Sequence, residues 1–206
     1  AILNKQPVAY SDRFREQFEQ TDIFVIEICS IKKYIYQGYY LHHLAVDTRL
    51  KFCSETPEKV IRETKVVRQD RSEVEEDIDE ILSLIHPKKV LFVSHINAVV
   101  NNRKQGRISR ACSAAVENMQ RWFTPNRTYS PAGHTIASRA ELIELLGEAA
   151  GKRGVPFFDP TVVFNRYRQD KVLQREEPGL PPGHYTDFGN KVMGRLYAQQ
   201  IRKIMA

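Results

Sequence analysis

Cysteine is scarce in this chain of 206 residues, which has only Cys29, Cys53 and Cys112. The three are widely separated and form no CxxC pair, and an odd number of cysteines cannot all pair with one another. This pattern argues against a disulfide scaffold and against a zinc knuckle. Reduced thiols are typical of a cytoplasm-like compartment, so we expect a cytoplasmic protein.

Long apolar runs are also missing. The longest, such as Ile23–Ile28 and Val90–Val93, fall far below the roughly 20 residues that a membrane-spanning helix needs. No signal-peptide pattern is present, and the chain begins at Ala1 rather than methionine, so we expect that upstream sequence was cut away, processed or left out. The sequence predicts no membrane span.

Local motifs for cofactors are absent as well. The sequence contains no GxxxxGK[ST] phosphate loop, no dinucleotide-binding fingerprint and no HExxH metal motif. A zinc site built from His95, Asp159 and His184 is chemically conceivable but has no local motif to support it. We therefore expect no cofactor and no metal.

The charge balance is basic, with a formal net charge of +6 and a pI near 9.2. The basic residues are spread along the chain, and their densest stretch lacks the interleaved aromatic residues of a surface that binds single-stranded nucleic acid. This stretch contains Arg103, Lys104, Arg107 and Arg110. A glycan-facing or solvated loop is the simpler interpretation, and a nucleic-acid scaffold ranks last among our hypotheses.

The hydrophobic content, by contrast, is sufficient for a folded protein. It is 42% of the residues, enough for one sizeable core in a chain that is short for two domains. We predict one domain over residues 1–206.

Short apolar runs and amphipathic segments alternate along the chain. The runs are four to six residues long and bounded by polar turns, which is typical of buried parallel strands; they are Ile23–Ile28, Val90–Ser94 and Val155–Phe158. One-sided apolar stripes predict helices over Ser72–Ile85, Ser138–Lys152 and about Asp187–Met205. Alternation of this kind predicts an α/β fold with a parallel sheet.

The ends of these helices carry recognisable signals. Ser72, followed by Glu75 and Glu76, suits the start of the first helix, because a hydroxyl can cap free amides and carboxylates favour the positive end of the helix dipole. Gly151 and Gly154 end the second helix.

Two connections, residues 31–71 and 95–137, are longer than ordinary turns and predict insertions at the ends of the sheet. The first contains an aromatic patch made of Tyr34, Tyr36, Tyr39, Tyr40, His42 and His43. A packed hairpin is the favoured interpretation of this patch, and stacking on a ligand is the alternative.

Polar residues lie at or just after the end of each predicted strand. Open parallel sheets bind ligands outside the carboxyl ends of their strands. The first strand offers Glu27, Cys29 and Ser30, the second offers Ser94, His95 and Asn97, and the third offers Asp159. His95 could act as an acid–base group and Asn97 as an oxyanion donor, or the two could simply fix the following loop. Asp159 could bind substrate or simply end its strand.

His184 stands in the run Gly183–Gly189, just ahead of the last helix and after a stiff Pro- and Gly-rich approach. Imidazole is the side chain best suited to proton transfer near neutral pH, and loops on a rigid scaffold often carry catalytic groups. We predict His184 as a catalytic base; the alternative is that it caps the helix.

Taken in order, these segments resemble an SGNH/GDSL-type hydrolase domain, particularly the divergent SGNH-like domains of bacterial surface-polysaccharide biosynthesis. The resemblance covers residues 20–206 and is carried by Asp22–Ile28, Val90–Ser94, Gly154–Asp159 and the block Gly183–Thr186 with Gly189. It implies a three-layer, flavodoxin-like sheet and acyl transfer from an ester.

The sequence departs from the family pattern at three places. No Gly-Asp-Ser-type turn occurs near Ala1–Tyr10, Ile31 stands at the family's asparagine, and Pro181 replaces the aspartate three residues before the histidine. Because that acid orients the histidine, its loss should cost much of the rate, unless Glu176, Glu177 or Asp187 substitutes for it.

The leading hypothesis is an esterase or acyltransferase that acts on an acyl ester, chiefly of a carbohydrate. His184 is its general base, a serine before Ala1 or at an unrecognised position is its nucleophile, and Ser30, His95, Asn97 and Asp159 bind the substrate. The alternative is a catalytically inactive SGNH-like domain used for binding or assembly, since a fold does not imply its function.

Overall fold

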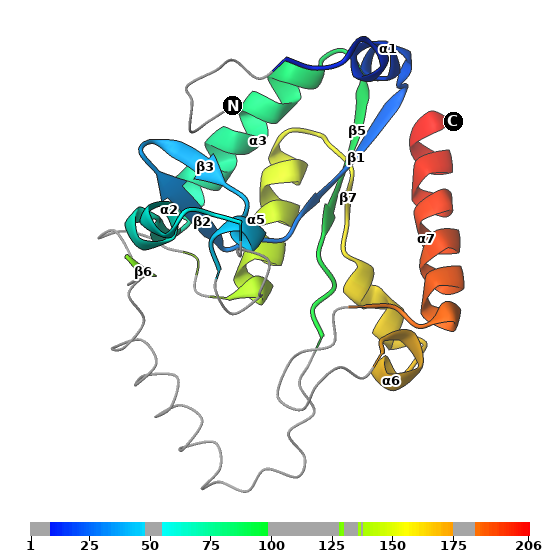
Figure 1. Ribbon diagram of the computed structural model, residues 1–206. Coiled ribbons are helices and arrows are strands. Elements are labelled where there is room, and N and C mark those ends of the chain that lie inside the picture. Colours follow the sequence, from blue (N-terminus) through cyan, green and yellow to red (C-terminus); the bar gives the residue numbers. More distant parts are fainter. Residues whose placement is uncertain (1–8, 48–54, 99–127, 130–135, 137, 175–183) are drawn as a thin grey trace, which may run out of the picture. The chain divides into compact units, whose positions relative to one another are not determined.

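A computed structural model describes residues 9–47, 55–98, 128–129, 136, 138–174 and 184–206 (Figure 1). Contacts within the chain define two compact units. Unit 1 comprises Ala1–Thr21, Ser30–Val74 and Arg107–Ala137, and unit 2 comprises Asp22–Cys29, Glu75–Gly106 and Ser138–Ala206. The single domain over residues 1–206 stays a prediction. Several sequence predictions fall outside the described residues: Cys53, Cys112, the basic stretch 103–110, Glu176, Glu177 and Pro181.

Unit 2 contains a three-stranded parallel sheet in the order β1-β5-β7. Its strands are β1 (Ile23–Ile28), β5 (Lys89–Ser94) and β7 (Phe157–Phe158). The register of β1 on β5 runs from Ile23 opposite Lys89 to Ile28 opposite Ser94. The predicted parallel sheet is therefore confirmed, and the first strand has the predicted bounds.

The third strand is shorter than the sequence predicts. Val155 was expected to begin it, but its N–H donates to the carbonyl of Ala150 and closes the end of the preceding helix. Gly154, at φ +63°, makes the left-handed turn that permits this closure. Pro156 then accepts a bond from the N–H of Phe92, so pairing begins beside β5 and the strand covers only Phe157–Phe158.

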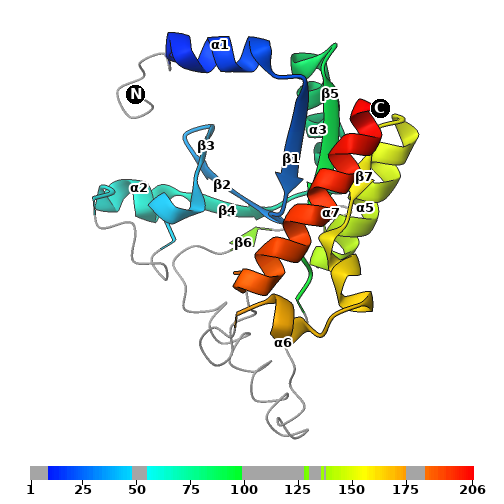
Figure 2. The same ribbon diagram turned by 90° about the vertical axis from the view of Figure 1, so that its right-hand side faces the viewer.

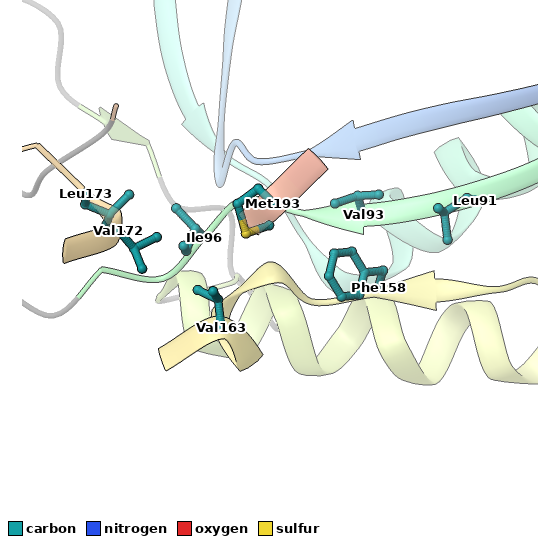
Figure 3. Close-up of a cluster of buried hydrophobic side chains, with 8 residues drawn as sticks. All are labelled: Leu91, Val93, Ile96, Phe158, Val163, Val172, Leu173 and Met193. Carbon is teal, nitrogen blue, oxygen red and sulfur yellow. The ribbon is translucent and has the colours of Figure 1, made fainter. Parts of the chain in front are cut away.

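Helices cover both faces of this sheet. Helix α5 (Arg139–Lys152) packs Gly147 against the ring of Phe157, whereas α7 (Asp187–Met205) places Met193 with Leu91, Val93 and Phe158. Figure 1 shows α5 and α7 on opposite sides of the strands, and in Figure 2 α7 lies in front of them. The cluster beneath α7 is drawn in Figure 3 and extends to Ile96, Val163, Val172 and Leu173. The last two come from α6 (Gln169–Val172) and the residue after it, and Val163 comes from η3 (Pro160–Asn165).

The chain passes from unit 1 to unit 2 within α3 (Arg71–Ile85). The predicted cap at Ser72 is wrong, because Asp70 has that role. Its carboxylate accepts a bond from the N–H of Ser72 at 2.9 Å, and its own N–H donates to the Glu73 carboxylate at 3.0 Å. This reciprocal pair is a capping box placed two residues earlier than expected.

Within unit 2, α3 is tied to α5 by an ion pair. Arg153 makes a two-pronged contact with Asp79, with N–O distances of 2.5 and 2.6 Å. The contact links the C-terminal end of α5 to α3.

Unit 1 contains a four-stranded sheet in the order β3-β2-β4-β6. Its strands are β2 (Lys32–Tyr36), β3 (Tyr39–Leu41), β4 (Lys65–Arg68) and β6 (Thr128–Tyr129), and its described helices are α1 (Asp12–Gln20), η1 (His43–Ala45) and α2 (Glu58–Glu63).

The predicted aromatic hairpin in this unit is confirmed. Strands β2 and β3 are joined at Gln37 and Gly38, whose φ angles of +49° and +84° suit a type I′ turn. Tyr36 is buried with Val46 and Val60 beside this hairpin. Tyr36 thus belongs to a small core with Tyr34 partly buried against it, whereas Tyr39 and Tyr40 are exposed.

Candidate functional site

The carboxyl edge of the parallel sheet in unit 2 has two chemically different sides. The register places Glu27 opposite Val93, and Val93 opposite Phe158. Since side chains alternate along a strand, Glu27 and His95 lie on the side covered by α7. Ser94 and Asp159 lie on the other side.

On the α7 side, a carboxylate and an imidazole are paired. Oε1 of Glu27 lies 2.5 Å from Nδ1 of His95, and the side chains are 48% and 30% exposed, respectively. A carboxylate only accepts hydrogen bonds, so this contact requires the proton on Nδ1 and leaves Nε2 as an acceptor when the ring is neutral. The pair therefore presents a basic nitrogen.

Two tyrosines lie within the field of the same carboxylate. Burial, Tyr197 and the charge of Glu27 raise the pKa of Tyr185 to about 12. Burial and Glu27 also raise the pKa of Tyr197, whose ring packs edge-on against Phe158 at 5.4 Å between centroids. Both phenols thus keep their protons at neutral pH and can serve as hydrogen-bond donors.

Cys29 follows β1 and is also influenced by Glu27. Partial burial of the thiol and the Glu27 carboxylate raise the pKa of Cys29, and the positive charge of Arg139 opposes them. The Arg139 guanidinium donates to the carbonyl of Ile96 at 3.3 Å. At neutral pH Cys29 is therefore a protonated thiol near an acid–base pair and a cation.

Asp159 organises the opposite side of the edge. One of its carboxylate oxygens accepts bonds from the hydroxyl of buried Ser94 at 3.0 Å and from the N–H of Thr161 at 2.9 Å. The Thr161 hydroxyl in turn accepts from the N–H of Asn97 at 2.9 Å. This network connects the ends of β5 and β7, as expected if Asp159 ends its strand.

His184 lies in a firmly anchored segment. Its carbonyl accepts a bond from the N–H of Gln174 at 2.9 Å, and the N–H of Thr186 donates to the carbonyl of Val172 at 2.9 Å. Thr186, rather than His184, caps α7, because its hydroxyl accepts from the N–H of Gly189 at 3.0 Å. The alternative that His184 is the cap is wrong. The residue itself is exposed, and its neighbour Tyr185 lies within the field of Glu27.

Ser30 has a local role in unit 1. Its hydroxyl accepts a bond from the N–H of Lys32 at 3.1 Å and donates to the carbonyl of the same residue. The structure thus brings His95, Asn97 and Asp159 together at the sheet edge of unit 2, with Asn97 present through its backbone. Ser30 belongs to the other unit. Substrate binding by these four residues stays a prediction, as does catalysis by His184.

Three groups at this edge were not among the predicted site residues: Glu27 as a partner of His95, and the phenols of Tyr185 and Tyr197. Glu27 had a detectable signal, since it is the only charged residue in the apolar run Ile23–Ile28. The tyrosines had none, because the packing of α7 places Tyr197 and an antiparallel bridge to Leu173 places Tyr185.

In the described part of the chain, no three His, Cys, Asp or Glu side chains are grouped so that they could hold a metal ion. None of the described helices has the length and apolar character required to span a membrane.

The chain is similar to one family of known proteins over part of its length. A family described as the TviD N-terminal domain matches residues 123–199. The Vi polysaccharide biosynthesis protein TviD of Salmonella typhi is 24% identical over 158 residues, which are 76% of this chain and 15% of that protein. No solved structure matches the chain. The chain is thus distantly related to a polysaccharide biosynthesis protein and spans a small part of its length.

Proposed function

We propose that this chain is an SGNH-like acyl-transfer domain that acts on an ester of a carbohydrate in the biosynthesis of a polysaccharide. The observation that carries the proposal is the imidazole–carboxylate pair of His95 and Glu27 at the carboxyl edge of a parallel sheet, the usual ligand site of open α/β sheets. The distant relationship to a polysaccharide biosynthesis protein supports the choice of carbohydrate.

The strand order supports a flavodoxin-like sheet. In the order 2-1-3-4-5 of that fold, the last three strands follow one another on the same side of the first. The order β1-β5-β7 has the same simple progression. We propose that these strands are the third, fourth and fifth of such a sheet, within one SGNH-like domain.

In this proposal His184 is the general base that activates a serine nucleophile. His95, Asn97, Ser30 and Asp159 contribute to substrate binding. The reaction passes through a tetrahedral intermediate, whose oxyanion needs fixed hydrogen-bond donors. The Tyr185 phenol, which keeps its proton, is a suitable donor.

The test is labelling of the full-length protein with a fluorophosphonate, followed by peptide mapping. We expect one serine to be labelled in the wild type and His184→Ala to abolish the label. His86→Ala is the matched control, since His86 is exposed beyond the far end of α3. Absence of labelling in a folded wild-type protein would favour the alternative of a binding or assembly domain.

A further inference from the structure

Glu27 is not explained by the folding of its strand. Its carboxylate stands in an otherwise apolar run, and the next residue on the same side of β1, Val25, is 43% exposed. A partly exposed ion pair contributes little to stability, about 0–1 kcal/mol. A chemical role accounts for the pair better than a structural one.

The contact fixes the state of the imidazole. With the Nδ1 proton held by the Glu27 carboxylate, Nε2 of His95 is the free acceptor. A carboxylate in this position selects the tautomer and stabilises the imidazolium that forms after proton uptake. The Glu27 carboxylate also acts on Cys29, Tyr185 and Tyr197, and Arg139 acts on Cys29.

We infer that His95, oriented by Glu27, is a second proton-transfer site, distinct from His184, which activates the hydroxyl that accepts the acyl group. The inference rests on the proposed function and concerns its second step, the transfer of the acyl group from the enzyme to the acceptor hydroxyl. Its substrate class is a hydroxyl compound, either a sugar or water. His95 is the catalytic residue and Glu27 a positioning residue.

The proton balance of the step is simple. The acceptor oxygen forms a bond to the acyl carbonyl carbon while its proton moves to Nε2 of His95. When the tetrahedral intermediate collapses, the bond from that carbon to the oxygen of the nucleophilic serine breaks, and the serine oxygen takes the proton from Nε2. Glu27 accepts the Nδ1 hydrogen bond throughout and is never protonated.

The first experiment measures the two halves of the reaction separately in the full-length protein, with p-nitrophenyl acetate as donor and water as acceptor. The nitrophenolate burst reports acylation, and the steady state that follows reports transfer to water. We expect His95→Gln to keep the burst and to slow the steady state by about 10²–10⁴-fold, the range for general-base catalysis. Glu27→Gln should slow it to a smaller extent and move its pH profile, whereas Glu80→Gln, at an exposed site on α3, should do neither.

The outcomes separate the two proposals. If the wild-type protein shows no burst, or if the burst persists in His184→Ala, the proposed function is overturned. A normal burst followed by wild-type turnover in both His95→Gln and Glu27→Gln overturns the inference alone.

A second measurement needs no substitution. The ¹⁵N shifts of the His95 ring in the wild-type protein should show a proton on Nδ1 and a free Nε2 in the neutral form. A neutral ring with its proton on Nε2 would overturn the inference even if a variant failed to fold.

Discussion

Gly189 approaches Val172 so closely that a Cβ atom on Gly189 would lie 2.1 Å from the Val172 carbonyl oxygen. The same carbonyl accepts the N–H of Thr186, which caps α7. The contact therefore seats the first turn of α7 on α6 and fixes the segment that carries His184 and Tyr185.

The close approach of Gly189 to Val172 predicts that even a methyl side chain at position 189 destabilises the protein. Gly189→Ala should lower the free energy of unfolding by about 3 kcal/mol, the upper part of the range for overpacking, because the obstacle is backbone. Gly194→Ala on the same helix is the control, since nothing lies within 4 Å of its Cβ position and its site is exposed. It should stabilise the protein by up to about 1 kcal/mol. Urea denaturation of both variants checks this, and equal effects would contradict it.

The raised pKa of Tyr185 predicts that the protein loses stability at alkaline pH. Its pKa is about 12 in the folded protein against about 10 in an unfolded chain. Between these values the folded state holds the phenolic proton and the unfolded state does not, so stability falls as the pH rises from 10 to 12. Tyr185→Phe should flatten this fall, and Tyr40→Phe, at a residue that is 67% exposed, should not. Thermal unfolding midpoints at several alkaline pH values provide the measurement, and the same slope in all three proteins would refute the assignment.

The sequence predicted those parts of the fold that depend on local pattern. The stripe of apolar residues in α7 predicted its bounds because the helix is long enough to define its period, and the continuous apolar run Ile23–Ile28 predicted β1 because such runs are typical of parallel strands. Short elements were missed. The four residues of β4 and the six of α2 carry too few positions for either period to stand out.

The candidate site was predictable only in part. Parallel strands bring their carboxyl ends together, which is why His95 and Asp159 could be proposed from their places after two strands. Which side of the sheet each occupies depends on register, and a shift of one residue reverses it. The pairing of Glu27 with His95 therefore had to come from the structure.

Cys29 provides a test of the charges at the site. Because Glu27 raises the pKa of the thiol and Arg139 lowers it, Glu27→Gln should speed alkylation of Cys29 by iodoacetamide at pH 7.5 and Arg139→Gln should slow it. The thiolate is the reacting species, so the rate follows its population. Peptide mapping separates Cys29 from Cys53 and Cys112. Changes of the same sign in both variants would show that the charges do not act as described.

The capping box of α3 is tested by a pair of substitutions. Asp70→Ala should cost about 1 kcal/mol, as for other lost N-caps. Ser72→Ala removes only an exposed hydroxyl bond to the Asp70 carboxylate and should cost less than about 0.5 kcal/mol. Chemical denaturation ranks the two variants. If Ser72→Ala lowered the stability more than Asp70→Ala, Ser72 would be the cap of α3, as predicted from the sequence.

Asp159 can be tested for a role beyond structure. Asp159→Asn keeps an oxygen acceptor for the Ser94 hydroxyl and the Thr161 N–H, so it should stay within about 1 kcal/mol of the wild type. Asp159→Ala leaves the hydroxyl of buried Ser94 without that acceptor and should cost about 2 kcal/mol. If the carboxylate also binds substrate, Asp159→Asn should raise the KM for the acyl ester while stability is kept. A stable variant with an unchanged KM would limit Asp159 to joining the ends of β5 and β7.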